Sequence, residues 1–167
     1  MNQIINIMDL INDFISRVTR YLSGIAILVQ MIVVFVGVVF RYGLHSPLVW
    51  ADELARYTLI FVTFIGGYTA TKDGSLAKID LLIEAVSGRT KKVLLFFVHL
   101  SLLLFSLLLV YFDIKLTMSP SVAKLHSPAL WLPMSVMYSL IPISMGLIAW
   151  HSLIEILKLF IRSEQKR

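Results

Sequence analysis

Four histidines are the side chains of this sequence that could bind a cofactor within a membrane. His99 and His151 each lie inside a long apolar run, and His45 and His126 each precede a Ser-Pro pair. Histidine is a common axial ligand of haem iron, so a facing pair is compatible with a b-type haem and with a membrane anchor of a redox complex. The simpler interpretation is neutral histidine near a membrane surface, and both interpretations stay open.

Charged side chains gather in one short stretch. Trp50, Glu53 and Arg56 recur every third residue, which places them close to one face of a helix. No Asp, Glu, Lys or Arg lies in the middle of any apolar run, and the chain contains no cysteine. An enzyme needs a nucleophile, an acid–base pair or a metal site, and a transporter working alone shows charge or a broken helix in mid-membrane. We therefore expect no catalysis, no cofactor and no substrate site in this chain alone.

Composition indicates a membrane protein with lipid as a partner. Of the 167 residues, 58% are hydrophobic and 15% are charged, whereas about a quarter of a soluble domain is charged. The net charge of +5 comes from basic residues at the ends of apolar runs. This distribution indicates membrane topology and argues against nucleic acid as a partner.

The apolar runs predict an all-α integral membrane protein with four transmembrane helices. We expect one transmembrane domain over residues 21–167, because an uncharged run of about 20 residues crosses the hydrocarbon layer. Its spans are predicted at about 21–41, 47–73, 92–113 and 128–157. In the second span only Tyr57–Thr71 is free of charge, about 22 Å of helix at 1.5 Å per residue. Its first turns are therefore expected in the headgroup layer or against another protein.

Local signals predict where these helices start and stop. Ser46 is expected to cap the second span, with Pro47 at the first helical position and Gly74 as the stop. Pro128 is expected to start the fourth span, in which Pro133 and Pro142 predict bends.

Two shorter helices are predicted at a membrane surface. Residues 1–20 repeat apolar side chains at helical spacing, with Asn, Asp and Arg on the other face. This pattern indicates an amphipathic helix in the interface, and an extension of the first span is an equally good interpretation. Residues 75–87 show the same pattern and predict a helix on the inner surface.

Lysine and arginine positions predict the orientation. With both termini inside, eleven of these residues fall on the inner side and four on the outer side. Short cytoplasmic segments carry the excess of Lys and Arg. Both termini are therefore predicted to be cytoplasmic.

A short internal sequence repeat occurs in the two outer segments. Residues 44–50 read LHSPLVW and residues 125–131 read LHSPALW, so five of seven positions agree. A duplicated helix hairpin is one interpretation. The other is that Ser-Pro and an interfacial Trp are a common way to start a helix at a membrane surface.

The order of several motifs resembles one known family. The motifs are Arg41-Tyr42 after the first span, Trp50, Glu53, Gly66, Gly74 and Ile79-Asp80-Leu81-Leu82. The sequence resembles the small membrane (Q-type) subunit of tripartite ATP-independent periplasmic (TRAP) transporters, although the family often has His-Ile where this chain has Leu76-Ala77. The resemblance implies a scaffold in the bacterial inner membrane, beside a large sodium-coupled transport subunit. It also implies a periplasmic protein that captures an organic acid such as sialic acid or a C4-dicarboxylate.

Two sets of contact residues follow from this interpretation. The residues predicted at the interface with the large subunit are Arg41, Tyr42, Trp50, Glu53, Arg56, Gly66, Gly67 and Asp80. The residues predicted to dock the periplasmic protein are Lys115, Lys124 and His126.

Overall fold

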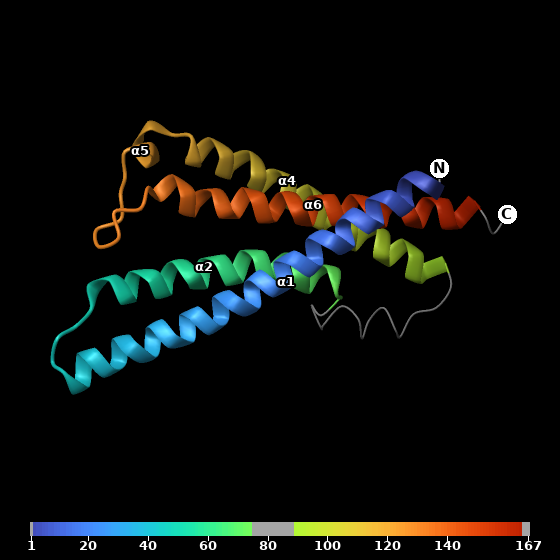
Figure 1. Cartoon of the computed structure of the whole chain (residues 1–167). Coiled ribbons are helices and arrows are strands. Elements are labelled where there is room, and N and C mark those ends of the chain that lie inside the picture. The colour runs from blue at the N-terminus through green and yellow to red at the C-terminus, as the bar shows by residue number, and fades with distance from the viewer. Residues whose placement is uncertain (1, 75–88, 165–167) are drawn as a thin grey trace.

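The structure is a computed structural model that describes residues 2–74 and 89–164. Figure 1 shows its helices arranged as two long hairpins. The helices are α1 (Asn2–Val38), the π-helical turn η1 (Val39–Gly43), α2 (Val49–Lys72), α4 (Arg89–Thr117), α5 (Pro120–Ala123) and α6 (Met134–Glu164). The described residues contain no β-strand, and only an isolated bridge joins His126 to Pro133.

The two hairpins are α1 with α2 and α4 with α6, and α6 also contacts α1 and α2. Figure 1 shows the segments 44–48 and 118–133 at one end of the molecule, which we call the loop end. The start of α1 and the end of α6 lie at the opposite end, which we call the terminal end. The polar side chains buried at these two ends determine how the hairpins are joined.

Three helical segments are long and apolar enough to cross a membrane: Ile7–Gly43, Thr90–Thr117 and Met134–Leu159. The prediction of an all-α membrane protein is therefore confirmed. Helix α2 is not among these segments, because its charge-free part is short and charged residues lie at both of its ends.

Helix α1 runs without a break through residue 20. Residues 2–20 and the first predicted span therefore form one continuous helix, as in the alternative interpretation of an extended span. The physical reason is the polar face of this segment. Asn12, Ser16, Thr19 and Ser23 are all buried within the protein, so this face is held against other helices instead of lying on a membrane surface.

The start of α2 differs from the prediction, whereas its end agrees. The residue before the helix is Leu48 in an extended conformation, and no side chain caps the free amides. Ser46 is not the cap, because the chain is still closing the preceding turn there and its amide donates to the Phe40 carbonyl oxygen (3.0 Å). Asp73 is the C-terminal cap of α2, and Gly74 follows it. Gly74 has a φ of 67°, as expected of a glycine that ends a helix.

The predicted helix start at Pro128 is wrong. Residues 125–133 form a loop, and α6 begins only at Met134, directly after Pro133. The loop is closed by backbone hydrogen bonds from the Ser127 amide to Leu132 (2.9 Å) and from the Met134 amide to Leu125 (3.0 Å). The Leu132 carbonyl oxygen and the Met134 amide are thereby used in the loop, whereas a helix starting at residue 128 would need both groups for its own hydrogen bonds. Pro142 lies inside α6, as predicted.

The two copies of the sequence repeat, residues 44–50 and 125–131, do not have equivalent structures. Helix α2 begins three residues after Ser46, whereas α6 begins seven residues after Ser127. The two copies therefore start their helices differently, which gives no support to a duplicated hairpin. The predicted surface helix at 75–87, with the interface candidate Asp80, lies outside the described residues.

Candidate functional site

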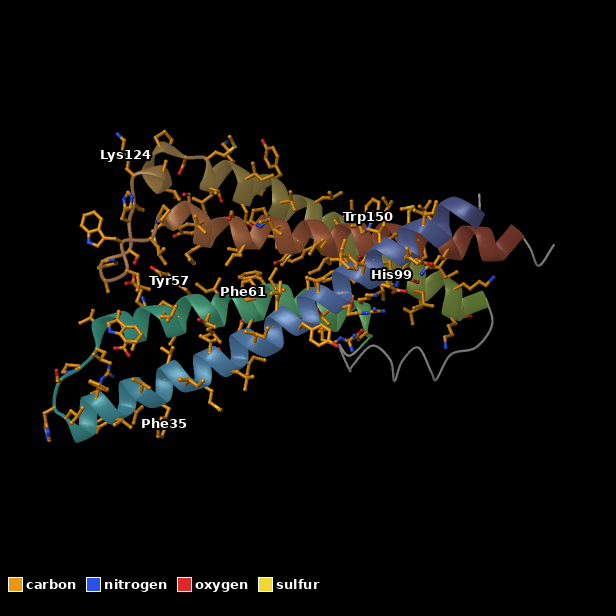
Figure 2. All side chains as sticks on the ribbon, in the orientation of Figure 1. Phe35, Tyr57, Phe61, His99, Lys124 and Trp150 are labelled. Carbon is orange, nitrogen blue, oxygen red and sulfur yellow. The ribbon has the colours of Figure 1, made fainter. Side chains whose placement is uncertain are left out.

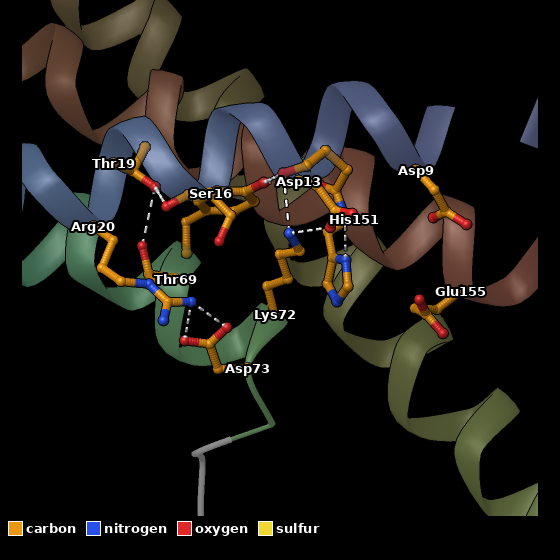
Figure 3. Close-up of polar contacts among 12 residues, drawn as sticks. Asp9, Asp13, Ser16, Thr19, Arg20, Thr69, Lys72, Asp73, His151 and Glu155 are labelled. Carbon is orange, nitrogen blue, oxygen red and sulfur yellow. Dashed lines mark hydrogen bonds and ion pairs between the residues drawn. The ribbon is translucent and has the colours of Figure 1, made fainter. Parts of the chain in front are cut away.

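A buried polar network joins three helices near the terminal end (Figure 3). The Tyr68 hydroxyl of α2 donates to the side-chain oxygen of Asn12 in α1 (2.7 Å) and lies 3.2 Å from the Asn12 carbonyl oxygen. The amide nitrogen of Asn12 lies 3.1 Å from Nδ1 of His151 in α6. Tyr68 is 0% exposed and Asn12 is 2% exposed. A single asparagine therefore connects α1, α2 and α6 away from water.

Further polar pairs surround this asparagine. The hydroxyls of Thr19 and Thr69 lie 3.0 Å apart and join α1 to α2 beside it. The ion pairs between helices are Lys72–Asp13 (2.6 Å), Arg20–Asp73 (2.8 Å) and Lys158–Asp9 (2.7 Å). At least one partner of each of these ion pairs is exposed or half-buried, and ion pairs that water reaches contribute little on their own. We therefore assign the stability of this junction mainly to the buried hydrogen bonds.

The two histidines considered as haem ligands meet at the same junction. Their rings, on α4 and α6, have centroids 6.1 Å apart and an interplanar angle of 82°. A porphyrin between them would have to separate α4 from α6, which pack directly against each other. Asn12 already contacts Nδ1 of His151. This arrangement of His99 and His151 fits a helix contact better than a haem site, and His45 and His126 are exposed in loops.

A second network lies at the loop end and centres on Glu53. One carboxylate oxygen of Glu53 accepts hydrogen bonds from the backbone amides of Ala129 (2.9 Å) and Leu130 (3.0 Å). The other oxygen accepts from the Tyr57 hydroxyl (2.7 Å). Glu53 is only 9% exposed. This carboxylate therefore fixes the loop before α6 to the first turns of α2.

The predicted interface residues do not all lie on an exposed surface. Tyr42 and Arg56 are exposed, Trp50 is 40% exposed, and Arg41 is ion-paired with Asp52. Glu53 stands apart from them, because its carboxylate is bound within its own chain.

The two adjacent glycines of α2 have different surroundings. A Cβ atom on Gly66 would lie 3.9 Å from the Ser23 hydroxyl oxygen, an ordinary contact, and one on Gly67 would meet nothing within 4 Å. Within the part of the chain that the structure describes, neither glycine therefore makes a close helix contact.

The predicted docking residues Lys115, Lys124 and His126 are all exposed. Figure 2 shows Lys124 at the loop end, directed away from the helices. The structure therefore leaves all three side chains accessible at one end of the molecule.

Sequence reasoning missed both polar networks. One signal for the first was present, because Asn12, Ser16, Thr19 and Ser23 line one face of a long apolar helix. Small and polar residues in such a helix often mark contacts with other helices. No local signal linked Glu53 to Ala129 and Leu130, which lie more than 70 residues away in the sequence.

Comparison with known proteins supplies the family. Residues 30–162 match the family described as tripartite ATP-independent periplasmic transporters, DctQ component. The chain belongs to the DctQ family. A putative TRAP transporter small permease protein of Haemophilus influenzae is 23% identical, and the alignment covers 64% of each chain.

Two longer permeases also match this DctQ-family chain. The isethionate TRAP transporter permease protein DctMQ of Oleidesulfovibrio alaskensis is 25% identical over 69% of this chain and 18% of its own length. The sialic acid TRAP transporter permease protein SiaT of Haemophilus influenzae is 24% identical over 61% of this chain and 17% of its own length. The DctQ-family chain thus spans less than two thirds of the length of each of these relatives. Its family makes it a membrane component of a transporter.

Proposed function

We propose that this chain is the non-catalytic small membrane subunit that supports the large transport subunit of a TRAP transporter. The proposal rests on one observation, which is that the buried polar side chains of the two networks have their hydrogen-bond partners within this chain. Asn12, Tyr68, His151 and Glu53 bind other parts of the same chain. Among the described residues these side chains join the helices of the chain to one another, which is the behaviour expected of a scaffold.

Extensive apolar surface is available for the large subunit and for lipid. Of the apolar windows in the segments Ile7–Gly43 and Thr90–Thr117, only 11% and 6% are buried within the chain. The matches to DctMQ and SiaT cover less than a fifth of those longer permeases. We infer that a large permease unit of this kind packs against these helices.

The proposed topology has four spans in the bacterial inner membrane, with α2 as the second span and both termini in the cytoplasm. Two observations support it. The start of α1 and the end of α6 lie at the same end of the molecule (Figure 1), and lysine and arginine favour that end as the inner one. The loop end would then face the periplasm, where Lys115, Lys124 and His126 are accessible to a soluble partner.

The proposed substrate is an organic acid, delivered by a periplasmic binding protein and imported with sodium. The printed names of two relatives include isethionate and sialic acid, and both are organic acids. A C4-dicarboxylate is a further candidate of the same class. Substrate binding and sodium coupling are assigned to the large subunit, because the described spans of this chain present no free charged group in mid-membrane.

Reconstitution into liposomes tests this function. The chain would be combined with the large permease chain and the binding protein from the same bacterium, under an inward sodium gradient. Uptake of sialic acid, isethionate and a C4-dicarboxylate would be compared with and without this chain. We expect one of the three acids to be taken up, and we expect this uptake only when all three components are present. Uptake by this chain alone, or full uptake without it, would contradict a scaffold role.

A further inference from the structure

The loop of residues 125–133, which we call the clamped loop, is closed by its own backbone. The amides of Ser127, Trp131 and Met134 donate to the carbonyl oxygens of Leu132, Ser127 and Leu125 at 2.9–3.1 Å. Ser127 is buried, and its hydroxyl oxygen lies 3.3 Å from the Leu130 amide. Such a closed loop has one preferred conformation before any partner binds.

Glu53 fixes the clamped loop to the helices. Its carboxylate accepts from two successive loop amides, those of Ala129 and Leu130, and from the Tyr57 hydroxyl. Hydrogen bonds to a carboxylate are stronger than those between neutral groups. The position of the loop relative to α2 is therefore set by a side chain that lies outside the loop.

The clamped loop exposes a large aromatic side chain. Trp131 is 77% exposed, and its φ of 52° is a left-handed conformation that is strained for a bulky residue. Its ring lies beside His126, with centroids 5.9 Å apart. An ordered loop therefore maintains a strained and exposed tryptophan, a combination that recurs at binding sites.

We propose that Trp131 is the anchor by which the clamped loop binds the soluble substrate-binding protein, with Glu53 as its positioning residue. The proposal rests on the proposed function and identifies where docking takes place. Tryptophan is enriched among the residues that dominate binding energy at protein interfaces. A fixed loop also loses little entropy on binding.

The charge around Trp131 indicates the chemistry of its partner. Lys124 and His126 are both exposed on the same segment, and the His126 ring lies beside the indole. We therefore expect the binding protein to present an apolar pocket for the indole, with acidic side chains at its rim. Lipid headgroups are a weaker candidate, because an interfacial tryptophan needs only the right depth and no fixed backbone.

A binding measurement tests the anchor directly. The complex of this chain with its large subunit, held in nanodiscs, would be titrated with the binding protein. Trp131→Ala should weaken the affinity roughly 30-fold, as expected for an interface anchor. Trp131→Asn should weaken it equally, although asparagine tolerates the left-handed backbone. Met118→Ala is the matched control, because Met118 is also 77% exposed at the loop end, and it should leave the affinity unchanged.

Glu53 variants test the positioning role. Glu53→Leu removes the acceptor of both loop amides, so hydrogen exchange at Ala129 and Leu130 should become faster and affinity should fall although Trp131 is intact. Glu53→Gln keeps one carbonyl oxygen for these amides and should restore most of the affinity. Equal affinity in Glu53→Leu and the wild type would overturn the positioning role.

The outcomes separate this inference from the proposed function. Wild-type binding with unchanged affinity in both Trp131 variants would overturn the anchor alone. If the same variants also lost thermal stability in nanodiscs but not in detergent, the partner of the ring would be the lipid headgroups. Absence of binding by the wild-type complex would overturn the docking part of the proposed function, and the anchor with it.

Discussion

The Tyr68 hydroxyl donates a 2.7 Å hydrogen bond to the side-chain oxygen of Asn12, and both residues are buried. Because the Asn12 amide nitrogen also lies beside His151, this bond belongs to the junction of α1, α2 and α6. A hydrogen bond of this kind stabilises a membrane protein modestly, by about 1 kcal/mol. Its larger effect is on geometry, because it fixes the rotation of α1 relative to the other helices.

We expect Tyr68→Phe to destabilise the isolated chain by about 1 kcal/mol, because the Asn12 oxygen loses a buried donor. For a protein of this size, that loss lowers the unfolding temperature by about 2–4 °C. Thermal unfolding in detergent measures the change. Tyr21→Phe is the control, since Tyr21 is exposed. Equal unfolding temperatures for Tyr68→Phe and the wild type would show that the bond is not formed.

Gly66→Leu and Gly67→Leu should affect different contacts. Leucine at position 66 would extend toward Ser23 of α1 and should lower the stability of the chain itself. A Cβ atom at position 67 meets nothing within 4 Å among the described residues, so Gly67→Leu should disturb the chain less than Gly66→Leu and lower the recovery of the large subunit in co-purification. Normal recovery with Gly67→Leu would instead place this face of α2 toward lipid.

Single cysteines can test the membrane topology, because the natural chain contains none. Ser46→Cys and Ser121→Cys, at the loop end, should react with a membrane-impermeant maleimide in intact spheroplasts. Thr90→Cys, in the first turn of α4, should react only after the membrane is permeabilised. Labelling of Thr90→Cys in intact spheroplasts would refute the proposed orientation.

Reversing two exposed charges should slow docking without disturbing the membrane complex. Lys115→Glu combined with Lys124→Glu should lower the association rate of the binding protein by roughly tenfold at low salt, because charge steers the encounter. The difference should shrink at physiological salt, where the screening length is about 8 Å. Stopped-flow measurement of association at two salt concentrations gives both values. If the rates at low salt are equal, docking takes place on the large subunit alone.

The sequence by itself determined the class of protein and the approximate position of its apolar helices. The spans predicted at 21–41 and 92–113 lie within helical segments, because an uncharged run of about 20 residues has few alternatives in a bilayer. The stop at Gly74 also followed from local chemistry, since only a glycine adopts that backbone conformation without strain.

Only the tertiary structure decided which polar residues meet. The face of α1 that contains Asn12 resembles an interfacial helix in the sequence, and it becomes a junction because Tyr68 and His151 lie opposite it. Likewise, Pro128 is a local signal for a helix start, but Glu53 binds the backbone that follows it and α6 begins later. Hydropathy and capping act over a few residues, whereas these partners are separated by 56 to 139 positions. The packing of the helices therefore determines which of these polar residues contact each other.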